Sequence, residues 1–287
     1  MFLLLSILCS SLINVVFKYF PKYQVDNQQA IMVNYWTCVI VGLLTSNNTV
    51  HSLSTNVQSS WGVYTMILGI LFITVFISMA VTAQKMGISV SVIAAKMGVV
   101  FPVVFAFVAL NDPINALLIF GILLSIISVF FVSNKSHIGL TGKSYLLLPL
   151  FVLVGSGIID TSLKVIELQL EGVSASAPTI LIFFFAAILG TVYTVFRLLR
   201  KQTDFVLKNV IAGIVLGIPN YFSIYFLFLA LQSNLFKTSQ VYPINNIGIV
   251  VASTLFSILI FKESLSKRNW TGIALAVVAI ILISIGG

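Results

Sequence analysis

The chain has 287 residues, of which 59% are hydrophobic and only 8% are charged, and its mean hydropathy is +1.13. Soluble domains carry about 25% charged residues, so this composition excludes an ordinary soluble protein and indicates a polytopic membrane protein. The net charge of +8 is scattered over short loops, which argues against a nucleic-acid partner. Two isolated cysteines and two histidines in separate loops form neither a disulfide framework nor a metal site, and we expect no cofactor.

Apolar runs long enough to cross a bilayer occur along the whole chain. A spanning helix needs about 20 mostly apolar residues. The first run lacks the basic region and cleavage site of a signal peptide, so we expect it to be retained. The predicted spans are 2–20, 29–46, 61–84, 88–110, 115–133, 144–166, 176–199, 206–230, 237–261 and 268–286. We therefore predict an all-α fold with ten transmembrane helices and no extramembrane domain.

The positive residues of the loops predict the orientation of these helices. Short cytoplasmic loops carry an excess of lysine and arginine. Such residues follow the first, third, fifth, seventh and ninth spans, and the clear examples are Lys22, Lys135, Lys143, Arg197, Arg200, Lys201, Lys208, Lys262, Lys267 and Arg268. The other loops contain no clear cation. The sequence thus predicts that both termini lie outside, and it favours a multi-pass protein of a bacterial inner (plasma) membrane.

Lys96 lies in the middle of the fourth predicted span, with Gly98 and Pro102 shortly after it. An ammonium group near the bilayer centre costs about 2.5–3.5 kcal/mol on insertion scales. Lys96 is also too far from either end of the span for its stem to reach water. The fold must therefore provide a polar cavity or a charged partner for this side chain.

Segments of the first half recur in the second half, 146 to 151 positions later. The matched segments are Met97–Val100 with Ile247–Val250, Leu12–Lys18 with Ile158–Lys164, and Asp112 and Gly121 with Glu263 and Gly272. Each half has five spans, an odd number, so the second half enters the membrane from the opposite side. We predict two inverted repeats, residues 1–137 and 138–287, with a substrate site near the midplane between them.

The duplicated five-helix unit resembles the EamA-like branch of the drug/metabolite transporter superfamily. The clearest segment is Phe261–Ser284, FKESLSKRNWTGIALAVVAIILIS. It is similar to the family's acidic turn, amphipathic connector and glycine-bearing final helix. The first half has Asn111-Asp112-Pro113 where glycine-glutamate is common. The resemblance covers essentially the whole chain and implies a transporter, since members export amino acids and other metabolites and relatives carry sugar phosphates and nucleotide sugars.

Polar residues inside the spans lie three or four positions apart, so they share helix faces. A lipid-facing amide or charge finds no partner, and we therefore expect these faces to line a common cavity. The candidate substrate-binding residues are Asn14, Lys18, Lys96, Lys164, Asn220, Tyr242, Asn245 and Asn246. Three lysines against one aspartate predict a positive cavity and an anionic or carboxylate-bearing substrate. Asp160, the acidic residue deep in a span, is the candidate proton-coupling group.

Each of these residues has a structural alternative. Lys96 and Asp160 can form an ion pair that holds the halves together, and Asp160 and Lys164, four positions apart, can neutralise one another. Lys18 can extend to the lipid headgroups. The adjacent asparagines of the ninth span can form hydrogen bonds between helices.

The expected function is secondary transport of small polar metabolites, as an exporter or exchanger, by alternating access and without chemistry on the cargo. A small-molecule substrate and membrane lipid are the partners that the sequence implies. The alternative within transport is an antiporter of phosphorylated metabolites or nucleotide sugars, with the lysines binding phosphate. A lipid-modifying membrane enzyme would need clustered histidines and carboxylates, and a channel would need a filter motif; the sequence shows neither.

Overall fold

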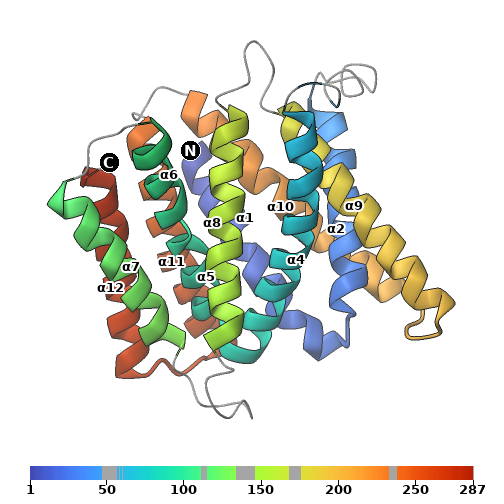
Figure 1. Ribbon diagram of the computed structural model, residues 1–287. Coiled ribbons are helices and arrows are strands. Elements are labelled where there is room, and N and C mark those ends of the chain that lie inside the picture. Colours follow the sequence, from blue (N-terminus) through green and yellow to red (C-terminus); the bar gives the residue numbers. More distant parts are fainter. Residues whose placement is uncertain are drawn as a thin grey trace.

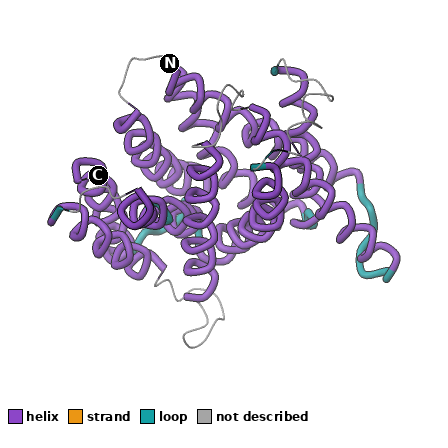
Figure 2. Tube along the Cα trace, turned by 45° about the horizontal axis from the view of Figure 1, so that its top comes forward, coloured by secondary structure: helices purple, strands orange, loops and turns teal. Residues whose placement is uncertain are grey.

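The computed structural model describes residues 1–46, 57, 59, 61–110, 115–133, 146–167, 176–232 and 238–286, and these residues form helices but no strand. The helices are α1 (Phe2–Tyr19), the 3-10 helix η1 (Phe20–Tyr23), α2 (Asn27–Thr45), α4 (Gly62–Met86), α5 (Ile88–Met97), α6 (Val100–Leu110), α7 (Ala116–Ser133), α8 (Leu147–Glu167), α9 (Ser176–Leu199), α10 (Leu207–Gln232), α11 (Thr238–Phe261) and α12 (Lys267–Gly286). They stand side by side in one bundle, with both ends of the chain towards its upper side in Figure 1. The turned view in Figure 2 shows that helices make up almost all of the described chain.

The predicted spans agree with these helices to within a few residues, with one exception. The fourth span, 88–110, is divided into α5 and α6 by a turn at Gly98. Proline has no N–H group, so Pro102 leaves the carbonyl oxygen of Gly98 without its usual donor, and the N–H of Phe101 binds this oxygen at 3.0 Å. The N–H groups of Gly98 and of the next residue also bind carbonyls three positions earlier, at 3.2 and 3.4 Å. This tighter 3-10 pattern interrupts the helix directly after the turn that carries Lys96.

Seven segments of the described chain are long and apolar enough to cross a membrane. They are Phe2–Tyr23, Gly62–Met86, Ile88–Phe105, Ser176–Leu199, Leu207–Leu227, Ile244–Phe261 and Lys267–Ile285, and α7 and α8 contain the shorter apolar stretches Ala116–Val132 and Leu147–Leu163. α2 is more polar, and two of its amides bind α10 through their oxygens, although the Nδ2 of Asn34 has no partner among the described residues. Gln29 accepts a hydrogen bond from Asn209 at 2.8 Å, and Asn34 accepts one from Asn220 at 3.1 Å. Both donors belong to α10.

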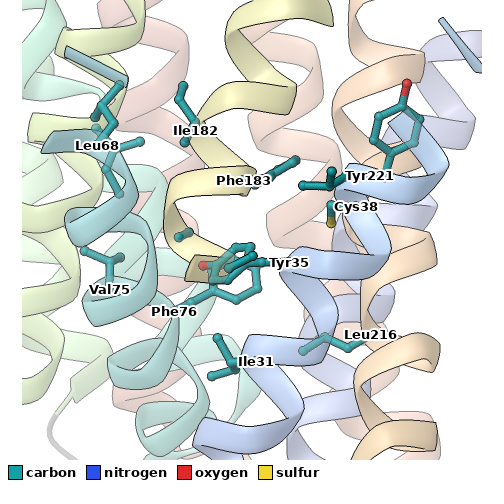
Figure 3. Close-up of a cluster of buried hydrophobic side chains, with 14 of the residues drawn as sticks. Ile31, Tyr35, Cys38, Leu68, Val75, Phe76, Ile182, Phe183, Leu216 and Tyr221 are labelled. Atoms are coloured by element: carbon teal, nitrogen blue, oxygen red, sulfur yellow. The ribbon is translucent and has the colours of Figure 1, made fainter. Parts of the chain in front are cut away.

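The apolar interior has two parts. The first lies between α1, α2, α4, α9 and α10. There Tyr35 stacks on Phe183 with ring centroids 5.7 Å apart, and Phe76 packs against the same tyrosine ring (Figure 3). The second surrounds α5, which is packed against α4, α7, α8 and α11, so that every residue of Ile88–Met97 except Lys96 is buried. Large apolar side chains on the outer faces of the helices are exposed, as a lipid-facing surface requires.

α7 and α12 meet through two glycines in a reciprocal contact. A Cβ at Gly121 would lie 3.0 Å from the backbone nitrogen of Ile283, and a Cβ at Gly272 would lie 2.9 Å from the backbone nitrogen of Val132. The two contacts correspond residue by residue, since Gly272 follows Gly121 by 151 positions and Ile283 follows Val132 by the same 151 positions. Because glycine has no side chain, the two backbones approach closely at both points.

Replacing either glycine by leucine should destabilise the bundle to a similar extent, because each new side chain would press on the partner helix. Extra methylenes forced into a packed contact cost about 1–3 kcal/mol. We expect Gly121→Leu and Gly272→Leu each to lower the midpoint of thermal unfolding in detergent, measured by size-exclusion chromatography of heated samples. Phe120→Leu, at an adjacent position that is 61% exposed, is the control and should leave the midpoint unchanged. Normal midpoints for both glycine variants would contradict the contact.

Candidate functional site

α8 crosses the break between α5 and α6 in direct backbone contact. A Cβ at Gly98 would lie 2.8 Å from the backbone nitrogen of Gly157 and 3.0 Å from the carbonyl oxygen of Leu153. A Cβ at Gly157 would in turn meet the ring of Phe101. The break and α8 are therefore held together through two glycines, with no side chain between the backbones.

This contact positions two ionisable side chains. Lys96 is two residues before Gly98, in the last turn of α5, where the helix dipole favours a cation. Asp160 is three residues after Gly157 in α8, so these two residues share one face of that helix. Both charged residues are thus placed by helices and not by loops.

Lys96 reaches accessible space from a helix that is otherwise enclosed. Its side chain is half-buried, whereas all other residues of Ile88–Met97 are buried. Helices pack around α5 on several sides. The space that the lysine reaches therefore lies within the bundle.

The exposure of Asp160 on α8 also indicates accessible space within the bundle. The outer face of this helix is marked by the exposed Val154 and Ile158. Asp160 lies about 200° around the helix from Ile158, on the face that carries the buried Ser156 and Gly157, and yet Asp160 itself is exposed. An exposed carboxylate on an inward face indicates a water-accessible cavity inside the bundle at this level.

No ion pair within 4.0 Å joins Lys96 and Asp160, both of which are described. The ion pairs that the described residues form within this distance are Lys18–Glu263 at 2.9 Å and Arg197–Asp26 at 2.8 Å. The structure therefore places two partly accessible, opposite charges on the helices that cross at Gly98 and Gly157, without a close ion pair between them.

Two pockets lie elsewhere on the described surface. One, of about 380 Å³ between α6 and α8, is lined by Phe101, Val104, Phe105, Val108, Ile158, Thr161 and Ser162. The other, of about 470 Å³ at one end of the bundle, is lined by Pro21, Val25, Asp26, Asn27, Gln28, Ile77, Val81, Gln84, Tyr193 and Arg197. The first includes the outer face of α8 and is mostly apolar. Neither is lined by Lys96 or Asp160. We take the two charges as the candidate site because charged residues at membrane depth commonly mark substrate or ion pathways.

Two of the asparagines proposed from the sequence form hydrogen bonds between helices. Asn220 of α10 donates to Asn34 of α2 at 3.1 Å, and Asn245 of α11 accepts from Ser6 of α1 at 3.2 Å. Asn14 of α1 is buried, and its Oδ1 has no hydrogen-bond partner in the described part of the chain. Asn220 and Asn245 therefore connect helices, whereas Asn14 has an acceptor available.

The other proposed residues are distributed over the bundle. Lys18, near the end of α1, pairs with Glu263 and donates to backbone carbonyls of α4. Asn246 is half-buried in α11. The side chains of Lys164 and Tyr242 lie outside the described residues. The sequence reasoning missed the pairing of Lys18 with Glu263, although both lie at the predicted cytoplasmic ends of odd-numbered spans and so were expected on the same side.

The seven long apolar segments and the absence of strands among the described residues indicate an all-helical, multi-pass membrane protein. No protein-family model matches the chain. A protein of known crystal structure shares the fold, with a TM-score of 0.60 over 96% of this chain and 95% of that chain at 13% identity. The chain is 30% identical over 283 residues to an uncharacterized protein of Haemophilus influenzae, and the match covers 97% of this chain and 95% of that protein. It belongs to the family of this bacterial protein.

The inward cavity predicts which face of α8 meets water. In a background with Cys9 and Cys38 replaced by alanine, Asp160→Cys should react with a charged, water-soluble thiol reagent, although the residue lies about 10 Å from the nearer end of α8. Ile158→Cys, two positions away on the exposed apolar face, should not react, because lipid excludes the charged reagent. Labelling rates measured in membranes check both variants. The reverse pattern would contradict the cavity.

Proposed function

We propose that the protein is a secondary transporter of small polar metabolites that carry a carboxylate, such as amino acids, and that it works by alternating access without chemistry on the cargo. The observation that supports this most directly is the pair of opposite charges, on Lys96 and Asp160, at membrane depth on two helices that cross through Gly98 and Gly157. Charged residues at membrane depth are costly and commonly mark substrate or ion pathways.

The helix break beside Lys96 supports the same function. Discontinuous helices commonly form the substrate sites of secondary transporters, because free N–H groups at the start of a half-helix attract anionic groups. Here α6 begins two residues after Gly98. The N–H groups of Phe101 and Val103 already bind carbonyl oxygens, so the ammonium of Lys96, with the positive end of the α6 dipole nearby in the chain, is the group that would bind a carboxylate. Asp160 then offers a partner to an ammonium group of the same cargo.

The charges also favour this cargo over a phosphorylated one. Lys18, one of three lysines expected to bind phosphate, is engaged by Glu263. One lysine and one aspartate facing each other suit a molecule with both an anionic and a cationic group better than they suit a phosphate with two negative charges. We therefore place amino acids before sugar phosphates.

Alternating access rests on the proposed division into inverted repeats, 1–137 and 138–287, with ten spans formed by α1, α2, α4, the α5–α6 unit and α7 to α12. Helix contacts support it. In the proposed repeats, α1 corresponds to α8 and the α5–α6 unit to α11, and the contact of α1 with α11 is matched by that of α8 with α5. Likewise α2 corresponds to α9 and α4 to α10, and the contact of α2 with α10 is matched by that of α9 with α4. The reciprocal glycines of α7 and α12 follow the same relation. Gly98 and Gly248, 150 positions apart, also make corresponding contacts. A Cβ at Gly98 would meet Leu153 of α8, and a Cβ at Gly248 would meet Ile7 of α1.

Membership of the EamA-like branch is part of this proposal. The resemblance of Phe261–Ser284 and the paired contacts of the two halves support it. A bacterial relative supports a bacterial inner membrane, with both termini outside as the loop charges predict.

Removing the central charge should abolish transport. In proteoliposomes tested with amino acids, other carboxylates and sugar phosphates, the wild type should exchange amino acids. Lys96→Met keeps the apolar stem and removes the charge. A hydrogen bond to a charged group contributes about 1.5–3 kcal/mol, so exchange should fall at least about tenfold. Lys22→Met, at an exposed position beyond α1, is the control. Unchanged exchange by a well-folded Lys96→Met would exclude this site.

Asp160→Asn tests the coupling role separately. If the carboxylate carries the coupled proton, the asparagine variant should still exchange cargo, whereas accumulation driven by a pH gradient should disappear, since an amide cannot take up a proton. Both activities are measured in the same proteoliposomes. Accumulation that survives in Asp160→Asn would show that this carboxylate is not the coupling group.

A further inference from the structure

Lys18 and Glu263 form a largely buried ion pair at one end of the bundle. The Nζ of Lys18 lies 2.9 Å from Oε1 of Glu263, and the two side chains are only 22% and 11% exposed. The same ammonium donates to the carbonyl oxygens of Ala83 at 3.1 Å and Gln84 at 3.4 Å, in the last turn of α4. A cation is favoured at this position because it faces the negative end of the α4 dipole.

Glu263 lies beside the start of α5. The hydroxyl of Ser257 donates to its Oε2, and this oxygen lies 2.9 Å from the position that a Cβ on Gly87 would occupy. Gly87 has a φ of +109°, which L side chains rarely adopt, and it is the N-cap of α5 without a side-chain cap of its own. A carboxylate is favoured at this positive helix end. The ion pair therefore lies across the α4–α5 turn and complements both helix dipoles.

This contact joins the two proposed repeats. Lys18, α4 and α5 belong to residues 1–137, whereas Ser257 and Glu263 belong to residues 138–287. Beside the pair, the ring of Tyr19 lies 4.9 Å from that of Phe261, across the same boundary. Lys96 lies nine positions beyond Gly87, about 13 Å along α5. The ion pair thus lies between Lys96 and this end of the bundle.

The second ion pair at this end differs in its surroundings. Asp26 caps α2 by accepting from the N–H groups of Gln28 and Gln29, and Arg197 binds both Asp26 and the side chain of Gln28. It is therefore part of the start of a helix whose packing against α9 is extensive. Both pairs lie at a helix end and in a connection, but neither Lys18 nor Glu263 is the N-cap of a helix, so both charges can be rehydrated without opening the start of a helix.

We infer that the Lys18–Glu263 pair is a gate, which closes the cavity at the end carrying the connections after α1, α4 and α11 and must break for cargo to pass there. This rests on the proposed transport function. The loop charges predict that this end is cytoplasmic, so the structure represents the state closed to the cytoplasm.

Thiol labelling tests the gate without a known cargo. Asn14 lies one turn before Lys18 on α1, on the cavity side of the pair. In the background lacking Cys9 and Cys38, Asn14→Cys should react slowly with a membrane-impermeant maleimide added to the Lys18 side. Adding Glu263→Gln, which removes the charge but can still accept from Ser257, should accelerate labelling from that side about tenfold.

The matched control is Asp204→Asn. Asp204 is an exposed carboxylate at the same end of the bundle, where its backbone carbonyl binds Gln29, and its loss should leave the labelling rate unchanged. Right-side-out and inside-out vesicles show which end is cytoplasmic. If Glu263→Gln remains monodisperse and labels no faster than its parent, the pair is a permanent brace and the gate is excluded.

A cross-link provides the second test, should Glu263→Gln fail to fold. Lys18→Cys and Glu263→Cys, joined by a short cleavable bis-thiol reagent, should block exchange, and cleavage should restore it. Normal exchange by the cross-linked protein would also exclude the gate. If the uncross-linked protein moves no cargo of the panel, the transport proposal fails. If Glu263→Gln nevertheless changes the labelling rate, the Lys18–Glu263 pair still opens and closes.

Discussion

The structure depends on how one buried positive charge is compensated. An isolated lysine inside an apolar bundle is unstable unless a dipole, a counter-charge or water accompanies it. Lys96 lies in the last turn of α5, has the carboxylate of Asp160 on the helix that crosses beside it, and keeps part of its side chain accessible. These conditions require α8 to pass close to the break after α5. The glycine pair of Gly98 and Gly157 makes this approach possible.

The contacts of the bundle fall into two kinds that suit different tasks. Glycine contacts such as that of Gly121, and aromatic packing such as that of Tyr35 on Phe183, are dry and depend on close shape complementarity. The Lys18–Glu263 contact is polar and partly exposed, so its groups can exchange partners for water. Both kinds join residues 1–137 to residues 138–287; a protein that alternates between two states needs dry contacts that persist and a polar contact that can open.

The site was predictable residue by residue but not as an arrangement. The depth of Lys96 and Asp160 in the predicted spans is enough to select them as candidate site residues, because charges at that depth are costly and commonly functional. Helix periodicity also grouped Lys18 with Asn14, but periodicity gives only the side of the helix and not the neighbour on that side. The neighbour of Lys18 is Glu263, 245 positions away in the chain. Gly157 was missed too, although small residues in an apolar helix often mark a close crossing.

The sequence by itself determined where the helices begin and end. A segment in lipid must satisfy its backbone hydrogen bonds internally, so apolar length and turn residues are sufficient, and even the break at Pro102 has a local cause. Only the tertiary structure decided which face of each helix meets lipid and which meets the cavity. Most of these helices are apolar on all sides, so their own periodicity cannot distinguish the two. Contacts between residues more than a hundred positions apart, such as Ser6 with Asn245, make that distinction.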